Sequence, residues 1–247
     1  MQEGMFAEAI RIHGHGGEQV GGYLARPAEA GPHGSVVVIH HAPGYDEATK
    51  EIVRKFAAHG YAALCVDLHY REDSLDPAKA AAAVREAGGV PDDRFIGDIE
   101  GAIRYLRLLP SSNGKVGVIG YCSGGRQTYL AACRIPSLDA AVDCYGGGVV
   151  APPERLSPRQ PVAPIDLTPD LACPLLGLFG VEDRNPSPED VARTEQELKR
   201  LGKTYEFHTY ENAGHSFFSV DRPAYRQQAA VEGWVQVFSW FERYLGV

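Results

Sequence analysis

The sequence predicts an α/β protein in which a mostly parallel sheet is covered by helices on both faces. Short apolar, β-rich runs alternate with amphipathic stretches of helical spacing along the 247 residues. The alternation continues on both sides of a Pro-rich segment at 151–174, so this segment is expected to be a surface excursion and not a domain linker. The length is sufficient for a substantial core. We therefore expect one domain over residues 1–247.

The helices are identified by their apolar spacing and their ends. Between 92 and 109, apolar residues recur at helical intervals, and Ser187-Pro188-Glu189-Asp190 is a well-formed helix start. Asp76-Pro77 opens another helix, which Gly88-Gly89 ends. The expected helices are 47–59, 76–87, 92–109, 126–133, one beginning at 187, and 224–244. The expected strands are an early antiparallel one at 19–25, then 35–39, 62–67, 115–119, 140–145, 174–180 and 204–210.

The charge balance limits the partners. Lys and Arg number 24 against 32 Asp and Glu, for a formal net charge of -8. This argues against a nucleic-acid or anionic-membrane surface, while a small anionic substrate held by one local Arg remains compatible. Glu3 and Glu8 lie where a signal peptide would be apolar, and no transmembrane run is present. We expect no membrane partner and a cytoplasmic location.

The five cysteines also favour a cytoplasmic location. They occupy positions 65, 122, 133, 144 and 173 without a C-x-x-C pair, so reduced thiols are expected rather than a disulfide framework. Four of them are interpreted as small core residues.

Cys122 differs because it lies at the centre of Gly120-Tyr121-Cys122-Ser123-Gly124-Gly125, between an apolar run and a helical stretch. Small residues two before and two after the central residue are the spacing of a nucleophile elbow, here with Cys at the apex. The strand reverses sharply into a helix, so the flanking glycines must lack side chains. Placing Ser123 at the apex would put Tyr121 in a small-residue position. The helix N-terminus would also favour a thiolate at Cys122.

An elbow nucleophile needs an acid and a histidine from later loops. Asp183 follows the strand ending at 180, and His215 follows the strand ending at 210. Loops after parallel strands meet at the carboxyl edge of the sheet, so both are expected beside Cys122. Glu182 and Asp190 compete with Asp183, although Asp190 is better explained as a helix-start residue. His215 would move the proton, and Asp183 would orient the imidazole.

The oxyanion of the reaction would be bound by backbone N–H groups. One comes from Ser123, the residue after the nucleophile, and the other from the loop at 40–44. Pro43 has no N–H, which leaves Ala42 as the better donor. The histidines at 40, 41 and 69 are placed on the same edge, and at least one of them is expected to line the pocket. His13 and His15 are interpreted as a solvated turn, and no metal site is expected.

Together these motifs resemble dienelactone hydrolase (carboxymethylenebutenolidase), over nearly the whole chain. The resemblance includes the elbow at Cys122, the turn Gly180-Val181-Glu182-Asp183 and the loop Gly214-His215-Ser216-Phe217. The elbow with Cys is specific, whereas the other two motifs are shared by many α/β-hydrolases. It implies the α/β-hydrolase fold, a Cys-Asp-His triad, and hydrolysis of a small ester or enol-lactone through a thioester, without a cofactor.

The resemblance also implies substrate contacts. Arg71 occupies the place of an Arg that binds the substrate carboxylate, whereas a second Arg after the catalytic His is missing and Arg222 is off register. Losing one Arg weakens the case for dienelactone itself. His41 stands in place of a Glu that partners the resting Cys, which suggests the hypothesis that His41 helps hold Cys122 as a thiolate.

The walls of the pocket are expected to be aromatic. Tyr145 and Phe217 are assigned to the substrate pocket, and Phe218 is favoured as a core residue.

Two other function classes are considered. A noncatalytic protein of the same fold, with a redox-sensing or ligand-binding thiol, is the alternative, but Asp183 and His215 argue against it. A nucleotide-binding protein lacks support, because residues 120–125 give no G-x-G-x-x-G pattern and no Walker Lys follows.

Overall fold

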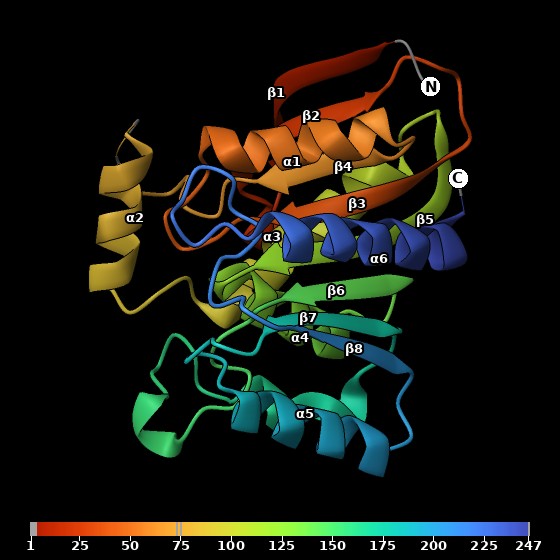
Figure 1. Ribbon diagram of the computed structural model, residues 1–247. Helices are drawn as coiled ribbons and strands as arrows, with labels where there is room; N and C mark the ends of the chain where they lie inside the picture. The colour runs from red at the N-terminus through yellow and green to blue at the C-terminus, as the bar shows by residue number, and fades with distance from the viewer. Residues whose placement is uncertain (1–3, 73, 75, 247) are drawn as a thin grey trace.

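The fold is built on one eight-stranded sheet with the strand order β1-β2-β4-β3-β5-β6-β7-β8 (Figure 1). The computed structural model describes residues 4–72, 74 and 76–246. β2 pairs antiparallel with β1 and β4, and the remaining neighbours are parallel, which confirms the predicted sheet. The strands are β1 Met5–His13, β2 Gln19–Pro27, β3 His33–Ile39, β4 Ala62–Val66, β5 Ser112–Tyr121, β6 Ala140–Cys144, β7 Leu175–Gly180 and β8 Tyr205–Tyr210.

Helices cover both faces of this sheet (Figure 1). α1 and α6 pack on one face, and α3 and α4 on the other. α2 stands apart from these layers, at the left of the view. The helices are α1 Glu47–Ala58, α2 Pro77–Glu86, α3 Asp92–Arg107, α4 Ser123–Arg134, α5 Pro188–Arg200 and α6 Gln227–Leu245. Among the described residues, no helix has the length and apolar character needed to span a bilayer.

Alternation along the central strands creates two cores. In β3, Val37 and Ile39 face α3 and α4, whereas Val36 and Val38 face α1 and α6. Successive side chains of a strand point to opposite faces, so a strand covered on both sides must be apolar throughout. All seven residues of β3 are buried. The sheet is therefore a rigid platform for the loops at its carboxyl edge.

Helix ends follow the local signals in the sequence. Ser187 and Asp190 form a reciprocal capping box at the start of α5, and Asp46 caps α1 by accepting the Thr49 N–H at 2.9 Å. The excursion at 151–174 contains two short 3₁₀ turns, at Pro153–Arg155 and Pro164–Asp170. The predicted helix at 126–133 begins earlier, at Ser123, directly after the elbow.

Candidate active site

Cys122 lies at the sharp turn between β5 and α4, with φ 58° and ψ -118°. Such a backbone is strained for a residue with a side chain and is typical of functional positions. A side chain at Gly120 would meet the Gly124 carbonyl and Thr128, and one at Gly124 would meet the Ile39 carbonyl. The two flanking glycines are therefore required by close backbone approach, as the spacing predicts.

Asp183 and His215 meet at the carboxyl edge of the sheet. The Asp183 Oδ2 lies 2.8 Å from the His215 Nδ1, and the carboxylate is only 4% exposed. The two loops are joined by a backbone bond from Glu182 N–H to the Ala213 carbonyl at 2.9 Å. Of the competing acids, Glu182 is exposed and Asp190 is used in the capping box of α5. The contact thus selects Asp183 as the partner of His215.

His215 also forms a side-chain hydrogen bond with Cys122. Since the Asp183 carboxylate is bonded to Nδ1 of His215, Nε2 is the ring nitrogen that remains to bond the Cys122 sulfur. Burial alone would lower the pKa of His215, but the hydrogen bonds to Asp183 and Cys122 outweigh it and raise that pKa to about 10. Burial would raise the pKa of the Cys122 thiol, yet the bond to His215 helps bring it below its ordinary value. The pair therefore favours thiolate and imidazolium.

Two backbone groups also face the sulfur. The N–H groups of Ser123 and Ala42 hydrogen-bond to Cys122 and contribute to the lowered pKa of its thiol. Both are the predicted oxyanion donors. Preorganised N–H groups beside the nucleophile are placed to stabilise negative charge on an attacked carbonyl oxygen.

His40 fixes the loop that carries Ala42. Its Nδ1 lies 2.8 Å from the His41 carbonyl, and its Nε2 accepts the Leu68 N–H at 3.2 Å. Burial lowers the pKa of His40 to about 3, so the ring is neutral and the accepting Nε2 persists. His40 therefore holds the loop that carries Ala42 against the segment at Leu68.

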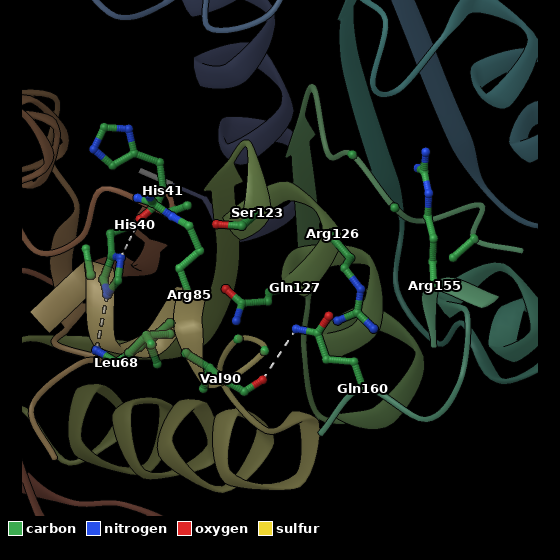
Figure 2. Close-up of a pocket in the computed structure, with 18 of the residues that line it drawn as sticks. His40, His41, Leu68, Arg85, Val90, Ser123, Arg126, Gln127, Arg155 and Gln160 are labelled. Atoms are coloured by element: carbon green, nitrogen blue, oxygen red, sulfur yellow. Dashed lines mark hydrogen bonds between the residues drawn. The ribbon is translucent and has the colours of Figure 1, made fainter. Parts of the chain in front are cut away.

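A cavity of about 390 Å³ lies beside this loop. Ala42 and Ser123 line one part of it, and α2 covers another. Figure 2 shows Arg85 and Arg155 on opposite sides, with Ser123 and Gln127 between them. Arg126 also lines the cavity, but its guanidinium is held by the Asp92 carboxylate at 2.8 and 3.1 Å. This acyl-side cavity, as we call it, combines hydrogen-bonding groups with cations.

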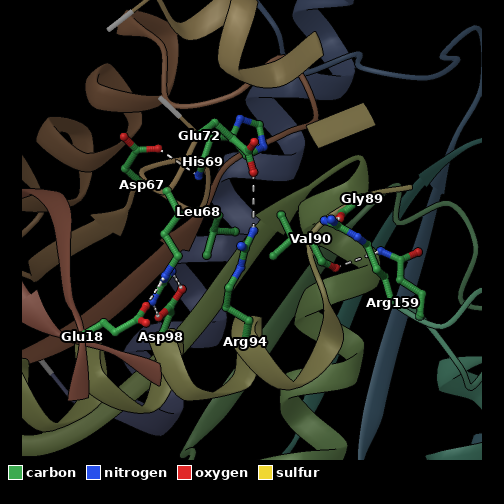
Figure 3. Close-up of polar contacts among 12 residues, drawn as sticks. Glu18, Asp67, Leu68, His69, Glu72, Gly89, Val90, Arg94, Asp98 and Arg159 are labelled. Atoms are coloured by element: carbon green, nitrogen blue, oxygen red, sulfur yellow. Dashed lines mark hydrogen bonds and ion pairs between the residues drawn. The ribbon is translucent and has the colours of Figure 1, made fainter. Parts of the chain in front are cut away.

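Arg71 is not part of that cavity, which corrects its prediction as a substrate ligand. Its guanidinium binds both oxygens of Asp98, at 2.8 and 3.0 Å, and Glu18 at 2.7 Å. Figure 3 shows these two carboxylates, Glu18 and Asp98, side by side. Asp98 is fully buried, so this pair ties the segment after β4 to α3. The hydrogen bonds to Asp98, opposed by burial and aided by Glu18, raise the pKa of Arg71. Because two carboxylates already neutralise it, Arg71 has a structural role.

The aromatic residues considered for the pocket lie in different environments. Phe217 is fully buried in the core, with its ring 5.3 Å from both Tyr145 and Tyr210, which corrects its assignment to the pocket. Phe218 is buried in the core, as predicted, and it also lines a second cavity together with Tyr145. Tyr145 also packs edge-on against the His215 ring at 5.2 Å.

His41 lines both cavities, and its Nε2 lies 2.6 Å from the Asp46 Oδ2. Its predicted role in holding the Cys122 thiolate stays a prediction.

Arg85, Gln127, Arg155 and Asn185 line the acyl-side cavity but were absent from the predicted site. Gln127 lies in the helix that follows the elbow, one turn after Ser123, which is a signal that sequence reasoning had available. Arg85 and Arg155 lie on α2 and in the Pro-rich excursion, whose positions relative to the sheet have no local sequence signal.

Comparison with known proteins identifies the family of this chain. The profile of the Dienelactone hydrolase family matches residues 20–245. A relative from Methylorubrum extorquens described as "Putative carboxymethylenebutenolidase" is 31% identical over 244 residues, covering 98% of this chain and 82% of the relative. A Bradyrhizobium relative described as "Probable 2-oxo-3-(5-oxofuran-2-ylidene)propanoate lactonase" is 30% identical over 224 residues, covering 90% and 88%.

A solved structure supports the same assignment. The crystal structure described as "Putative Dienelactone Hydrolase" from Klebsiella pneumoniae has a TM-score of 0.89 and 30% identity, and the match covers 98% of this chain and 100% of that chain. The profile match spans most of the chain, from β2 to the end of α6. The chain therefore belongs to the dienelactone hydrolase family and is a hydrolase with the α/β-hydrolase fold.

Proposed function

We propose that the protein hydrolyses a small carboxylic ester or lactone through a thioester on Cys122, without a cofactor. The observation that carries the proposal is the chain of contacts from Asp183 through His215 to Cys122, at an elbow with φ 58°. A nucleophile, a base and a group that orients the base are the parts required for acyl transfer.

In the first half-reaction the Cys122 thiolate attacks the acyl carbon, and the carbonyl oxygen takes the negative charge. The Ala42 and Ser123 N–H groups bind that oxygen. The intermediate collapses by breaking the bond between the acyl carbon and the leaving oxygen. His215 gives its Nε2 proton to that oxygen, which leaves as an alcohol or stays attached as the opened end of a lactone.

In the second half-reaction water attacks the thioester carbon. The now neutral His215 takes a proton from this water, and the carbon–sulfur bond breaks to release the carboxylic acid. The thiolate and imidazolium are regenerated. Asp183 orients the ring throughout and stabilises its charged form, since it is held 2.8 Å from Nδ1.

The thioester is the species to detect. Rapid mixing with p-nitrophenyl acetate is expected to give a burst of about one p-nitrophenolate per protein, and quenched samples should gain one acetyl group on the Cys122 peptide. Cys122→Ala should lose both signals, while Cys173→Ala, a buried cysteine in the other core, should keep them. A thiol that oxidises reversibly but never carries the acetyl group would favour the redox-sensing alternative.

We further propose that the substrate bears a carboxylate held by Arg85 and Arg155. Both line the acyl-side cavity, and neither makes an ion pair within the part of the chain that the structure describes. The lactonase relative is named for a propanoate that carries an oxofuran ring, which combines a carboxylate with a lactone. Guanidinium groups are well suited to binding carboxylates.

Replacing both arginines with Gln is expected to lower kcat/KM about thirtyfold for the methyl monoester of succinate, because each of the two charge-assisted hydrogen bonds to the carboxylate contributes on the order of 1 kcal/mol at such open positions. Methyl butyrate, which lacks the carboxylate, should be hydrolysed with nearly the same kcat/KM by both proteins. Arg193→Gln on α5 is the control. Equal losses for the charged and neutral esters would refute carboxylate binding here.

A further inference from the structure

A second cavity of about 400 Å³ lies between α1 and the loop after His215. It is separate from the acyl-side cavity, although His41 lines both. Its walls are mainly apolar and aromatic, and they include Ile52, Tyr121, Tyr145, Phe218, Ser219 and Trp234. We call it the aromatic cavity. Nothing in the mechanism above uses it.

The aromatic cavity adjoins the catalytic residues on the His215 side. Tyr121 directly precedes Cys122 in the elbow, and Tyr145 contacts the His215 ring edge-on at a centroid distance of 5.2 Å. Phe218 and Ser219 belong to the loop that begins at His215. Three of its walls thus come from segments that also carry or contact the catalytic groups.

The aromatic cavity lies on the side of the site where the alcohol half of an ester is expected. His215 delivers its proton to the leaving oxygen, so the alcohol half must lie on the His215 side of the attacked carbon. We propose that the aromatic cavity binds the alcohol half of an open-chain ester, and that this alcohol is uncharged and aromatic. The inference rests on the proposed function and names the substrate class more closely: acid and alcohol halves occupy different cavities.

The aromatic side chains that line this cavity favour an aromatic alcohol. The Phe218 ring packs edge-on against Trp234 at 5.5 Å and against Tyr121 at 5.8 Å, so a planar group in the cavity beside them meets both ring faces and ring edges. The Lys55 ammonium, which also lines the cavity, lies 4.2 Å from the centre of the Trp234 ring. The volume lies within the range of small-molecule sites.

The charges around the aromatic cavity favour an uncharged ligand. Lys55 and Arg54 are balanced by Glu51 and Asp221 among its lining residues. Arg54 is further held by Glu47 at 2.7 Å. This contrasts with the acyl-side cavity, where Arg85 and Arg155 lack such partners among the described residues.

A matched ester series tests the assignment. With the acyl group fixed as acetyl, the wild type is expected to hydrolyse benzyl acetate with at least tenfold higher kcat/KM than methyl acetate. Ala48→Phe, which places a ring in the aromatic cavity from the first turn of α1, should reduce this ratio at least fivefold. Ala192→Phe, on the exposed surface of α5, should leave the ratio unchanged. A ratio that Ala48→Phe does not change would overturn the inference.

Binding without turnover separates this inference from the proposed function. In Cys122→Ala, benzyl alcohol is expected to quench the fluorescence of Trp234 saturably, and Trp234→Phe in the same background should remove the response although Trp240 remains. Quenching without ester turnover by the wild type would mean that the proposed function is wrong while the cavity still binds the alcohol. Turnover without quenching or alcohol preference would reject the cavity assignment alone.

Discussion

His215→Asn is expected to lower kcat/KM for an activated ester by about 10⁴- to 10⁶-fold, the range of loss when a triad residue is removed. The change removes the proton acceptor and donor of both half-reactions. It also removes the hydrogen bond that helps hold the thiol pKa of Cys122 below its ordinary value. Asn is close to His in size and polarity, so the loop after β8 should keep its fold.

The pH dependence of kcat/KM tests whether the lost activity of His215→Asn comes from the loss of its ionising ring. In the wild type, kcat/KM should fall on the acid side as the Cys122 thiolate takes up a proton. It should fall again near pH 10, because the raised pKa means that His215 keeps its proton up to about that pH and loses it above. His215→Asn should lack the alkaline fall, and its pH midpoint for iodoacetamide alkylation of Cys122 should move upward.

His208→Asn is the matched control, since His208 pairs with Glu206 on β8 outside the site. Its activity and alkylation profile should equal those of the wild type. An unchanged alkylation midpoint in His215→Asn would show that His215 does not control the thiolate.

The residues whose positions could be predicted from sequence are those that depend on local geometry. Gly120 and Gly124 are required by the turn around Cys122, and the acid and histidine each follow a strand of a parallel sheet. The topology of such a sheet brings the ends of its strands to one edge, so separation along the chain did not hinder their identification.

The errors concern contacts that local geometry does not determine. Arg71 is neutralised by Glu18, 53 residues away, and by Asp98, 27 residues away, through a packing of the β1–β2 turn against α3 that no local pattern encodes. In the loop after His215, Ser216 has φ 67°, and such an irregular backbone removes any periodicity that would assign Phe217 to the core.

The ion pair of Asp92 and Arg126 is expected to dominate the stability of the region beneath the acyl-side cavity. The two side chains are 5% and 7% exposed, and the guanidinium binds both carboxylate oxygens at 2.8 and 3.1 Å. Asp92→Ala leaves Arg126 buried without its counter-ion, which should lower the free energy of unfolding by about 3–5 kcal/mol. The midpoint and slope of urea unfolding, followed by circular dichroism, measure this change.

The double variant Asp92→Leu with Arg126→Met shows whether the cost arises from an unpaired charge. Replacing a buried ion pair with apolar side chains of similar volume is often neutral, so its free energy of unfolding should lie within about 1 kcal/mol of the wild type. The pair joins the first turn of α3 to α4, the helix that begins at the elbow. If the double variant were as unstable as Asp92→Ala, the loss of stability could not be due to an unpaired guanidinium. The ion pair itself would then stabilise the packing of these two helices.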